Sequence, residues 1–251
     1  MIDTHVHLHI IDTEPERVIA DAAAVGVTHM IQVAIDMASI HANLSIYQHI
    51  SACSITGGIH PLSITDDITI EDVLAVLTMN QSRFCAIGEI GLDYKYGDHN
   101  KRRQQQFFEA QLAFARQHNM PVVIHARESN ADMIAIVNRY PDVRKVFHCY
   151  AQPYAFFESL SGNQNYVSFT GMITYAKKGK IVHAIRHIPA DRFFIETDSP
   201  YLKPKGVTAP QNTPQYLPHI AQHIAQIRDA SVEDIGAQTT KNARDFFGLE
   251  D

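Results

Sequence analysis

Two histidines near the start of the chain have a spacing suited to holding a metal ion. His5 and His7 flank Val6 at the end of the first predicted strand. In an extended strand, residues i and i+2 point to the same side, so both imidazoles face one point. Histidine is the commonest protein ligand of metal ions. A single His-X-His triplet also arises by chance, so the rest of the chain decides what it means.

Further side chains of ligand type stand where other apolar runs stop, at Glu89, His125, His148 and Asp198. Any one of them could simply cap or turn the chain, but six such residues at four or five different strand ends are not explained by capping. Imidazoles and carboxylates clustered together are poorly stabilised without a cation. The sequence therefore predicts a metal site made of His5, His7, Glu89, His125, His148 and Asp198.

The size of this donor set indicates two ions. Four histidines and two carboxylates exceed what one tetrahedral Zn²⁺ needs. They suffice for two divalent ions about 3.5–4 Å apart that share a bridging carboxylate. We predict that Glu89, central in the order of the runs, is the bridge and that Asp198 takes the proton of the attacking water. Histidine-rich ligation favours Zn²⁺ or Mn²⁺, although Mg²⁺ could support turnover through carboxylates and waters.

Two other residues are candidates for substrate binding at the same edge. His60 follows an apolar run in Gly-Ile-His-Pro, where it could donate to a phosphate or cap the turn before Pro61. Arg127 lies two residues beyond His125 and could bind a phosphate with two parallel hydrogen bonds. Its alternative is an ion pair with one of three carboxylates, those of Glu128, Asp132 and Glu89.

Four more features carry weaker expectations. Tyr94 and Tyr150 could stack on a nucleobase or could pack in the core. Glu196, two residues before Asp198, is expected to orient a ligand rather than to bind the metal. The lysines in residues 177–180 (KKGK) form a small basic cluster that could meet a nucleic-acid backbone or simply face solvent.

The runs that carry these residues alternate with helical patterns along the whole chain. Strands are predicted at residues 1–5, 28–33, 52–57, 84–89, 121–125, 145–148, 166–169 and 192–196. Helices are predicted at residues 16–24, 71–79, 101–118, 130–139, 155–161 and 181–187, with a further one at 231–247. Residues 200–218 are rich in proline and are predicted to form a long loop after the eighth strand.

Eight strands that alternate with helices predict an α/β fold, a single (β/α)₈ barrel of the TIM type over residues 1–251. A doubly wound open sheet often has a glycine-rich phosphate turn after its first strand, and the motifs GxGxxG and GxxxxGK[ST] are absent. The extra C-terminal helix is expected to pack on the outside of the barrel. The predicted ligands then share the carboxyl edge, where barrel enzymes have their active sites.

Composition limits the possible classes of protein. With 251 residues, 45% hydrophobic and 19% charged, the chain can bury a sizeable core and is not disordered. No apolar run approaches the roughly 20 residues of a membrane span, and the first residues lack signal-peptide character. Three widely spaced cysteines, Cys53, Cys85 and Cys149, make a disulfide framework unexpected, so a cytoplasmic protein is predicted. A net charge of −6 excludes a broad basic footprint for duplex DNA.

Taken together, the motifs resemble those of the TatD-type metal-dependent hydrolases, the TatD-related deoxyribonucleases of the amidohydrolase-like superfamily. They are residues 3–8 (DTHVHL), 58–61 (GIHP), 88–94 (GEIGLDY), the Q-x-x-x-F-x-x-Q spacing at 104–111, 121–127 (PVVIHAR), 196–202 (ETDSPYL) and 240–243 (TKNA). The resemblance implies that His5, His7, Glu89 and Asp198 hold one ion, and Glu89, His125 and His148 the second. It also implies hydrolysis of phosphodiesters in DNA or RNA, with nucleic-acid ends or single strands as substrate. Neither a membrane nor an obligate protein partner is expected.

Two departures from the family pattern bear on the substrate. The loop at residues 148–152 (HCYAQ) differs, and residues 204–214 keep Asn212 and Pro214 but lack the family's arginines. A binuclear-metal hydrolase of a small ester, lactone or cyclic amide is therefore the alternative. Such barrels often bridge their metals with a carbamylated lysine, where this chain has Glu89. A metal-stabilised binding protein without turnover is a third possibility, disfavoured by the complete ligand set.

Overall fold

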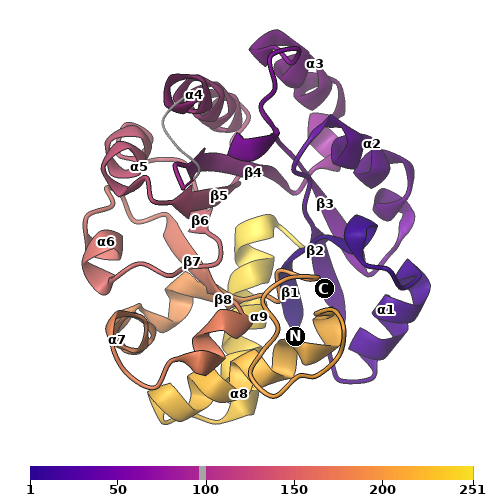
Figure 1. The fold of residues 1–251 in the computed structure, drawn as a ribbon, viewed down its shortest axis with the longest axis vertical. Helices are drawn as coiled ribbons and strands as arrows, with labels where there is room; N and C mark the ends of the chain where they lie inside the picture. The colour runs from indigo at the N-terminus through magenta and orange to yellow at the C-terminus, as the bar shows by residue number, and fades with distance from the viewer. Residues whose placement is uncertain (96–99, 251) are drawn as a thin grey trace.

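The computed structural model describes residues 1–95 and 100–250. Within these residues, eight parallel strands follow one another around a sheet in the order of the sequence (Figure 1). The strands are β1 (Ile2–Val6), β2 (His29–Gln32), β3 (Cys53–Gly57), β4 (Ala86–Asp93), β5 (Val122–Arg127), β6 (Lys145–Phe147), β7 (Asn165–Phe169) and β8 (Phe193–Ile195).

The sheet closes on itself where β1 meets the segment after β8. Val6 bridges to Ser199 in parallel fashion. The backbone N–H of Asp198 donates to His5 O at 3.0 Å, and that of His7 donates to Ser199 O at 2.8 Å. The predicted barrel is therefore confirmed, and its closure brings the two ends of the predicted ligand set together.

Helices surround the strands as an outer ring (Figure 1). They are α1 (Pro15–Ala23), α2 (Met37–Ser45), α3 (Ile70–Asn80), α4 (Lys101–Gln117), α5 (Asn130–Val137), α6 (Tyr154–Glu158), α7 (Lys180–His187) and α8 (Leu217–Arg228), followed by α9 (Val232–Phe247). Among the described residues, no helix has both the length and the apolar character that crossing a bilayer requires.

Two helices of the ring were not predicted, and the reasons are local. The buried face of α2 includes the polar residues Ser39 and Asn43, which weakens the apolar periodicity on which prediction depends. Helix α8 begins at Leu217, inside the stretch predicted as loop. Its second residue is Pro218, a position where a helix tolerates proline because the first N–H groups have no partner within the helix.

Helix α9 closes the amino-terminal end of the barrel rather than packing on its outside, so that expectation was wrong. Phe246 and Phe247 pack with Phe194, their ring centroids 5.2 and 6.0 Å from that of Phe194. The same cluster contains Val123 and Val146, which lie two residues before His125 and His148. Since i and i+2 share a face of a strand, the barrel interior is apolar at the end covered by α9 and polar at the other end.

Strand β4 runs four residues past its predicted end at Glu89. Its register with β5 shifts, since Ile87 pairs with Val122 but Ile90 pairs with Ile124, which places one extra residue in β4. Such a bulge redirects side chains. Glu89 therefore lies in the middle of β4, and the strand continues to a second carboxylate, Asp93, at the rim.

Candidate metal centre

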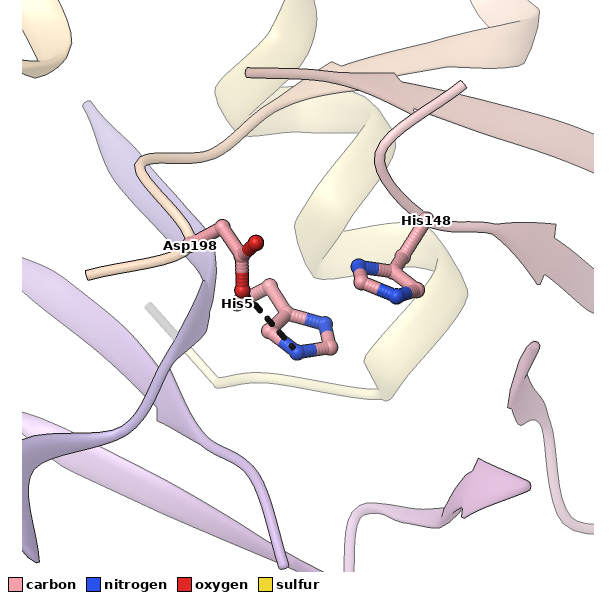
Figure 2. Close-up of side chains that lie close together, drawn as sticks. All are labelled: His5, His148 and Asp198. Carbon is pink, nitrogen blue, oxygen red and sulfur yellow. Dashed lines mark ion pairs between the residues drawn. The ribbon is translucent and has the colours of Figure 1, made fainter. Parts of the chain in front are cut away.

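The six predicted metal-binding side chains converge inside the carboxyl end of the barrel. His5, His148 and Asp198 come from different strands or strand ends and point toward a common space (Figure 2). Their donor atoms all lie within 4.8 Å of one another, and the same holds for two overlapping groups. Those groups are His5, His7 and Glu89, and His60, Glu89 and His125.

Glu89 lies at the centre of the cluster, with its two oxygens facing different histidine pairs. Its Oε1 is 2.7 Å from His148 Nε2 and 2.9 Å from His125 Nδ1. Its Oε2 is 3.4 Å from His5 Nε2 and 4.0 Å from His7 Nε2. This single carboxylate therefore divides the cluster into two neighbouring sets of donors.

Asp198 belongs to the set that contains His5 and His7. Its Oδ1 lies 3.8 Å from His5 Nε2 and 3.6 Å from His7 Nε2. The residue stands three positions beyond β8, in the left-handed region with a φ of 53°, a conformation that Asp adopts more readily than most residues. The turn brings the carboxylate back over the barrel mouth.

Three of the histidines have an oxygen behind them, at hydrogen-bond distance for His7 and His125 and at ion-pair distance for His148. His7 Nδ1 lies 3.2 Å from Val33 O, and since a carbonyl only accepts, Nδ1 carries the hydrogen. His125 Nε2 is 3.0 Å from Asp93 Oδ2, and His148 Nδ1 is 3.5 Å from Glu196 Oε1. A group behind a ligand in this way sets the ring orientation and leaves the other nitrogen for a metal.

The electrostatics of the cluster suit a cation. Burial alone would raise the pKa of Glu89, but the charge of His148 and hydrogen bonds from His125 and His148 hold that pKa well below its usual value. Burial opposes the charged form of His148, yet Glu89 and Glu196 hold the pKa of His148 well above its ordinary value. The carboxylates thus stay ionised because positive charge stands among them. A divalent transition ion can supply that charge, and a nitrogen-and-carboxylate donor set fits such an ion.

His60 lies beside Glu89 but presents a hydrogen to it. Its Nδ1 accepts a hydrogen bond from Leu62 N at 3.1 Å, so the neutral ring carries its hydrogen on Nε2, which lies 3.6 Å from Glu89 Oε1. Burial lowers the pKa of His60 to about 4. The ring is therefore a neutral hydrogen-bond donor near pH 7, consistent with the substrate-binding role predicted for it, which stays a prediction.

Arg127 is at the end of β5, where its side chain is 42% exposed and its Nη1 lies 4.0 Å from Asp93 Oδ2.

Tyr94 and Tyr150, which were considered as possible stacking partners for a nucleobase, are both buried. Tyr94 Oη donates to Asp132 Oδ2 and Tyr150 Oη donates to Pro153 O, so packing, the alternative considered for them, is confirmed.

Asp93 is a buried residue of this site that was not predicted from the sequence. Its side chain is 1% exposed, and it accepts from His125. The signal was present, because Glu89 and Asp93 are four residues apart, an even spacing that keeps both on one face of a strand. It was missed because the strand was predicted to end at Glu89.

Glu196, predicted to orient a ligand, accepts from Cys149 N at 2.7 Å and from Ser168 Oγ behind His148.

A closed parallel barrel with this donor set at its carboxyl end defines a metal-dependent hydrolase of the amidohydrolase-like superfamily. The chain belongs to the TatD-related DNase family, whose model matches residues 2–248.

Individual relatives agree with this assignment. The uncharacterized metal-dependent hydrolase YabD of Bacillus subtilis is 31% identical over 254 residues, 99% of each chain. The 3′-5′ ssDNA/RNA exonuclease TatD of Erwinia amylovora is 32% identical over 243 residues, 93% of each chain. Among solved structures, YJJV, a TatD homolog from Escherichia coli K12, matches with a TM-score of 0.88 and 24% identity over 100% of this chain and 98% of that one. This last likeness concerns the fold alone.

Proposed function

We propose that the protein is a phosphodiesterase dependent on two divalent metal ions, a deoxyribonuclease of the TatD type that acts on nucleic-acid ends or single strands. The observation that carries the proposal is the position of Glu89, whose two oxygens face separate histidine pairs. A carboxylate in this position is suited to bridge two ions.

In this proposal each donor set holds one ion. His5, His7 and Asp198 would hold the first together with Glu89 Oε2. His125 and His148 would hold the second together with Glu89 Oε1. The ions would be Zn²⁺, Mn²⁺ or Mg²⁺. When bound, two divalent ions acidify water and neutralise negative charge at the scissile phosphate.

The chain's own side chains supply the remaining chemistry. Asp198, an acceptor at the mouth of the barrel, takes the proton of the attacking water. His60 offers its Nε2–H to a phosphate oxygen, because Leu62 N occupies its other nitrogen. Arg127, with its side chain 42% exposed at the rim, donates to the phosphate from the β5 side.

Two observations bear on the substrate. A relative at 32% identity is described as an exonuclease of single-stranded DNA and RNA, which supports a polynucleotide. The segment 204–214 contains lysine but none of the arginines of the family pattern. Binding of backbone phosphates by this segment is therefore weaker than in a chain that has those arginines. This difference favours the alternative substrate, a small ester, lactone or cyclic amide.

A side-by-side assay separates these alternatives. Metal-loaded enzyme is given single-stranded DNA, a lactone panel and a phosphotriester panel, each with Mn²⁺, Mg²⁺ or Zn²⁺, after elemental analysis of the unsupplemented protein. The proposal predicts release of nucleotides from single-stranded DNA. Turnover of only the small molecules would contradict it, and tight metal occupancy without any hydrolysis would indicate a binding protein.

A further inference from the structure

The loops that follow β7 and β8 hold each other in place and form one wall beside the metal centre, here termed the β7–β8 wall (residues 171–180 and 200–212). β7 and β8 are neighbours in the barrel (Figure 1). Tyr175 Oη donates to Lys203 O at 3.3 Å, and Lys205 N donates to Thr174 Oγ1 at 2.7 Å. A Cβ at Gly171 would come within 2.2 Å of Leu202 O, so the close approach of the two loops requires glycine.

Two tyrosines are exposed on this wall. Tyr201 is 54% exposed, and its ring centroid lies 6.3 Å from that of His7 in an edge-on arrangement. Its backbone is fixed by the buried Asn212, whose Nδ2 donates to Tyr201 O. Tyr175 is 61% exposed and is attached to the same loop through its hydroxyl. One ring thus adjoins a predicted metal ligand, and the other is exposed on the neighbouring loop, with its hydroxyl on Lys203 O.

The wall contains basic side chains and no acidic ones. The chain contains 27 acidic residues, yet residues 159–190 and 199–228 contain no Asp or Glu. Lys177, Lys178 and Lys180 are all exposed directly after Tyr175. Loops on the other sides carry exposed carboxylates at Asp12, Asp66, Asp67 and Glu128. A polyanion approaching the site therefore meets favourable charge on the β7–β8 side.

From this arrangement we infer that a single-stranded polynucleotide runs from the metal centre over the β7–β8 wall. Its bases stack first on Tyr201 and then on Tyr175, and its phosphates meet Lys177 and Lys178. The inference rests on the proposed function and adds the route of the strand. It also gives a reason why single strands would be preferred over duplexes, because only unpaired bases offer a face for stacking on a tyrosine ring.

The tyrosine part is tested with Tyr175→Ala and Tyr175→Phe. Each variant is assayed with Mn²⁺ on a short oligothymidylate and on bis(p-nitrophenyl) phosphate, which has no base to stack. We expect the ratio of kcat/KM on the oligonucleotide to that on the small diester to fall at least about fivefold in the alanine variant, in line with the contribution of one stacked base. The phenylalanine variant keeps the ring and should keep the ratio. Met79→Ala, on a residue 82% exposed in α3, is the matched control.

The lysine part is tested through salt. In a Lys177→Ala/Lys178→Ala variant, the dependence of log KM for the oligonucleotide on log salt concentration should become shallower by about 0.7 for each lost phosphate contact. Lys241→Ala, on the exposed lysine of α9, should leave the slope unchanged. If wild-type enzyme hydrolyses neither substrate, the proposed function fails and this inference with it. If it hydrolyses both, but the substrate ratio and the salt slope are the same in all variants, only the inference is overturned.

Discussion

His125 donates a hydrogen bond from Nε2 to the buried Asp93 carboxylate at 3.0 Å, across the pairing between β5 and β4. This bond leaves His125 Nδ1 directed at Glu89, 2.9 Å away. The orientation of one predicted ligand thus depends on a carboxylate that does not face the centre of the cluster. Asp93 is a positioning residue, and its contribution can be measured separately from those of the ligands.

Asp93→Asn should lower metal affinity and turnover by about 10- to 100-fold, the usual effect of removing a charged group behind a ligand. An amide oxygen still accepts from His125 Nε2 but carries no charge, so the fold is expected to persist. Metal affinity is measured by competition with a chromogenic chelator. Asp142→Asn, which alters an exposed pair with Arg116, is the control. Undiminished affinity in Asp93→Asn would remove Asp93 from the site.

Glu89→Gln should fold and lose at least about 100-fold in turnover, equivalent to roughly 3 kcal/mol of barrier. The amide cannot bridge two cations with two anionic oxygens, so the content of bound metal per chain should also fall. Steady-state kinetics and elemental analysis of the purified variant provide the measurement, with circular dichroism to verify folding. Turnover equal to that of the wild type would exclude Glu89 from the mechanism.

Phe246→Ala should destabilise the protein by about 3–5 kcal/mol, because it opens a cavity in the cluster that fills the amino-terminal end of the barrel. Chemical unfolding followed by circular dichroism measures the loss. Met79→Ala removes an exposed side chain and should change stability by no more than about 0.5 kcal/mol. The specific activity of the folded variant should persist, since the metal centre is at the opposite end. A loss below about 1 kcal/mol would show that α9 does not close the barrel in solution.

The free energy of unfolding should increase as pH rises above about 8, because Lys145 loses its proton at a lower pH in the folded protein than in the unfolded chain. Its side chain is buried, its Nζ donates to Tyr140 O and Val143 O, and burial lowers its pKa to about 8 from the usual 10.5. Between these values the unfolded chain binds the proton and the folded protein does not, so the free energy of unfolding increases with pH by up to about 3 kcal/mol.

Comparison of wild type with Lys145→Met isolates this effect from other titrating groups. Unfolding free energies at about pH 7.5 and about pH 9.5 should show the wild type gaining stability relative to the variant. Parallel pH profiles of the two proteins would contradict the prediction.

Much of the fold was determined by the sequence alone. All eight strands and seven of the helices were predicted within a few residues, because each apolar run in a barrel is buried and each ends in a turn. The six predicted ligands are brought together by the closure of β1 on the segment after β8. Regular alternation of strand and helix predicts parallel strands, and in the eight-stranded barrel their carboxyl ends share one rim.

Other features were decided only by tertiary structure, because they depend on which buried surfaces pack against each other in the folded chain. Strands covered on both faces show no alternation that marks the interior, so the bulge in β4 between Ile87 and Ile90 could not be predicted. The sequence of an amphipathic helix such as α9 shows that the helix has an apolar face. It does not show which surface of the protein that face covers. Phe246 and Phe247 pack at the barrel end because apolar side chains from several strands, distant in sequence, leave a space there that only the closed barrel creates.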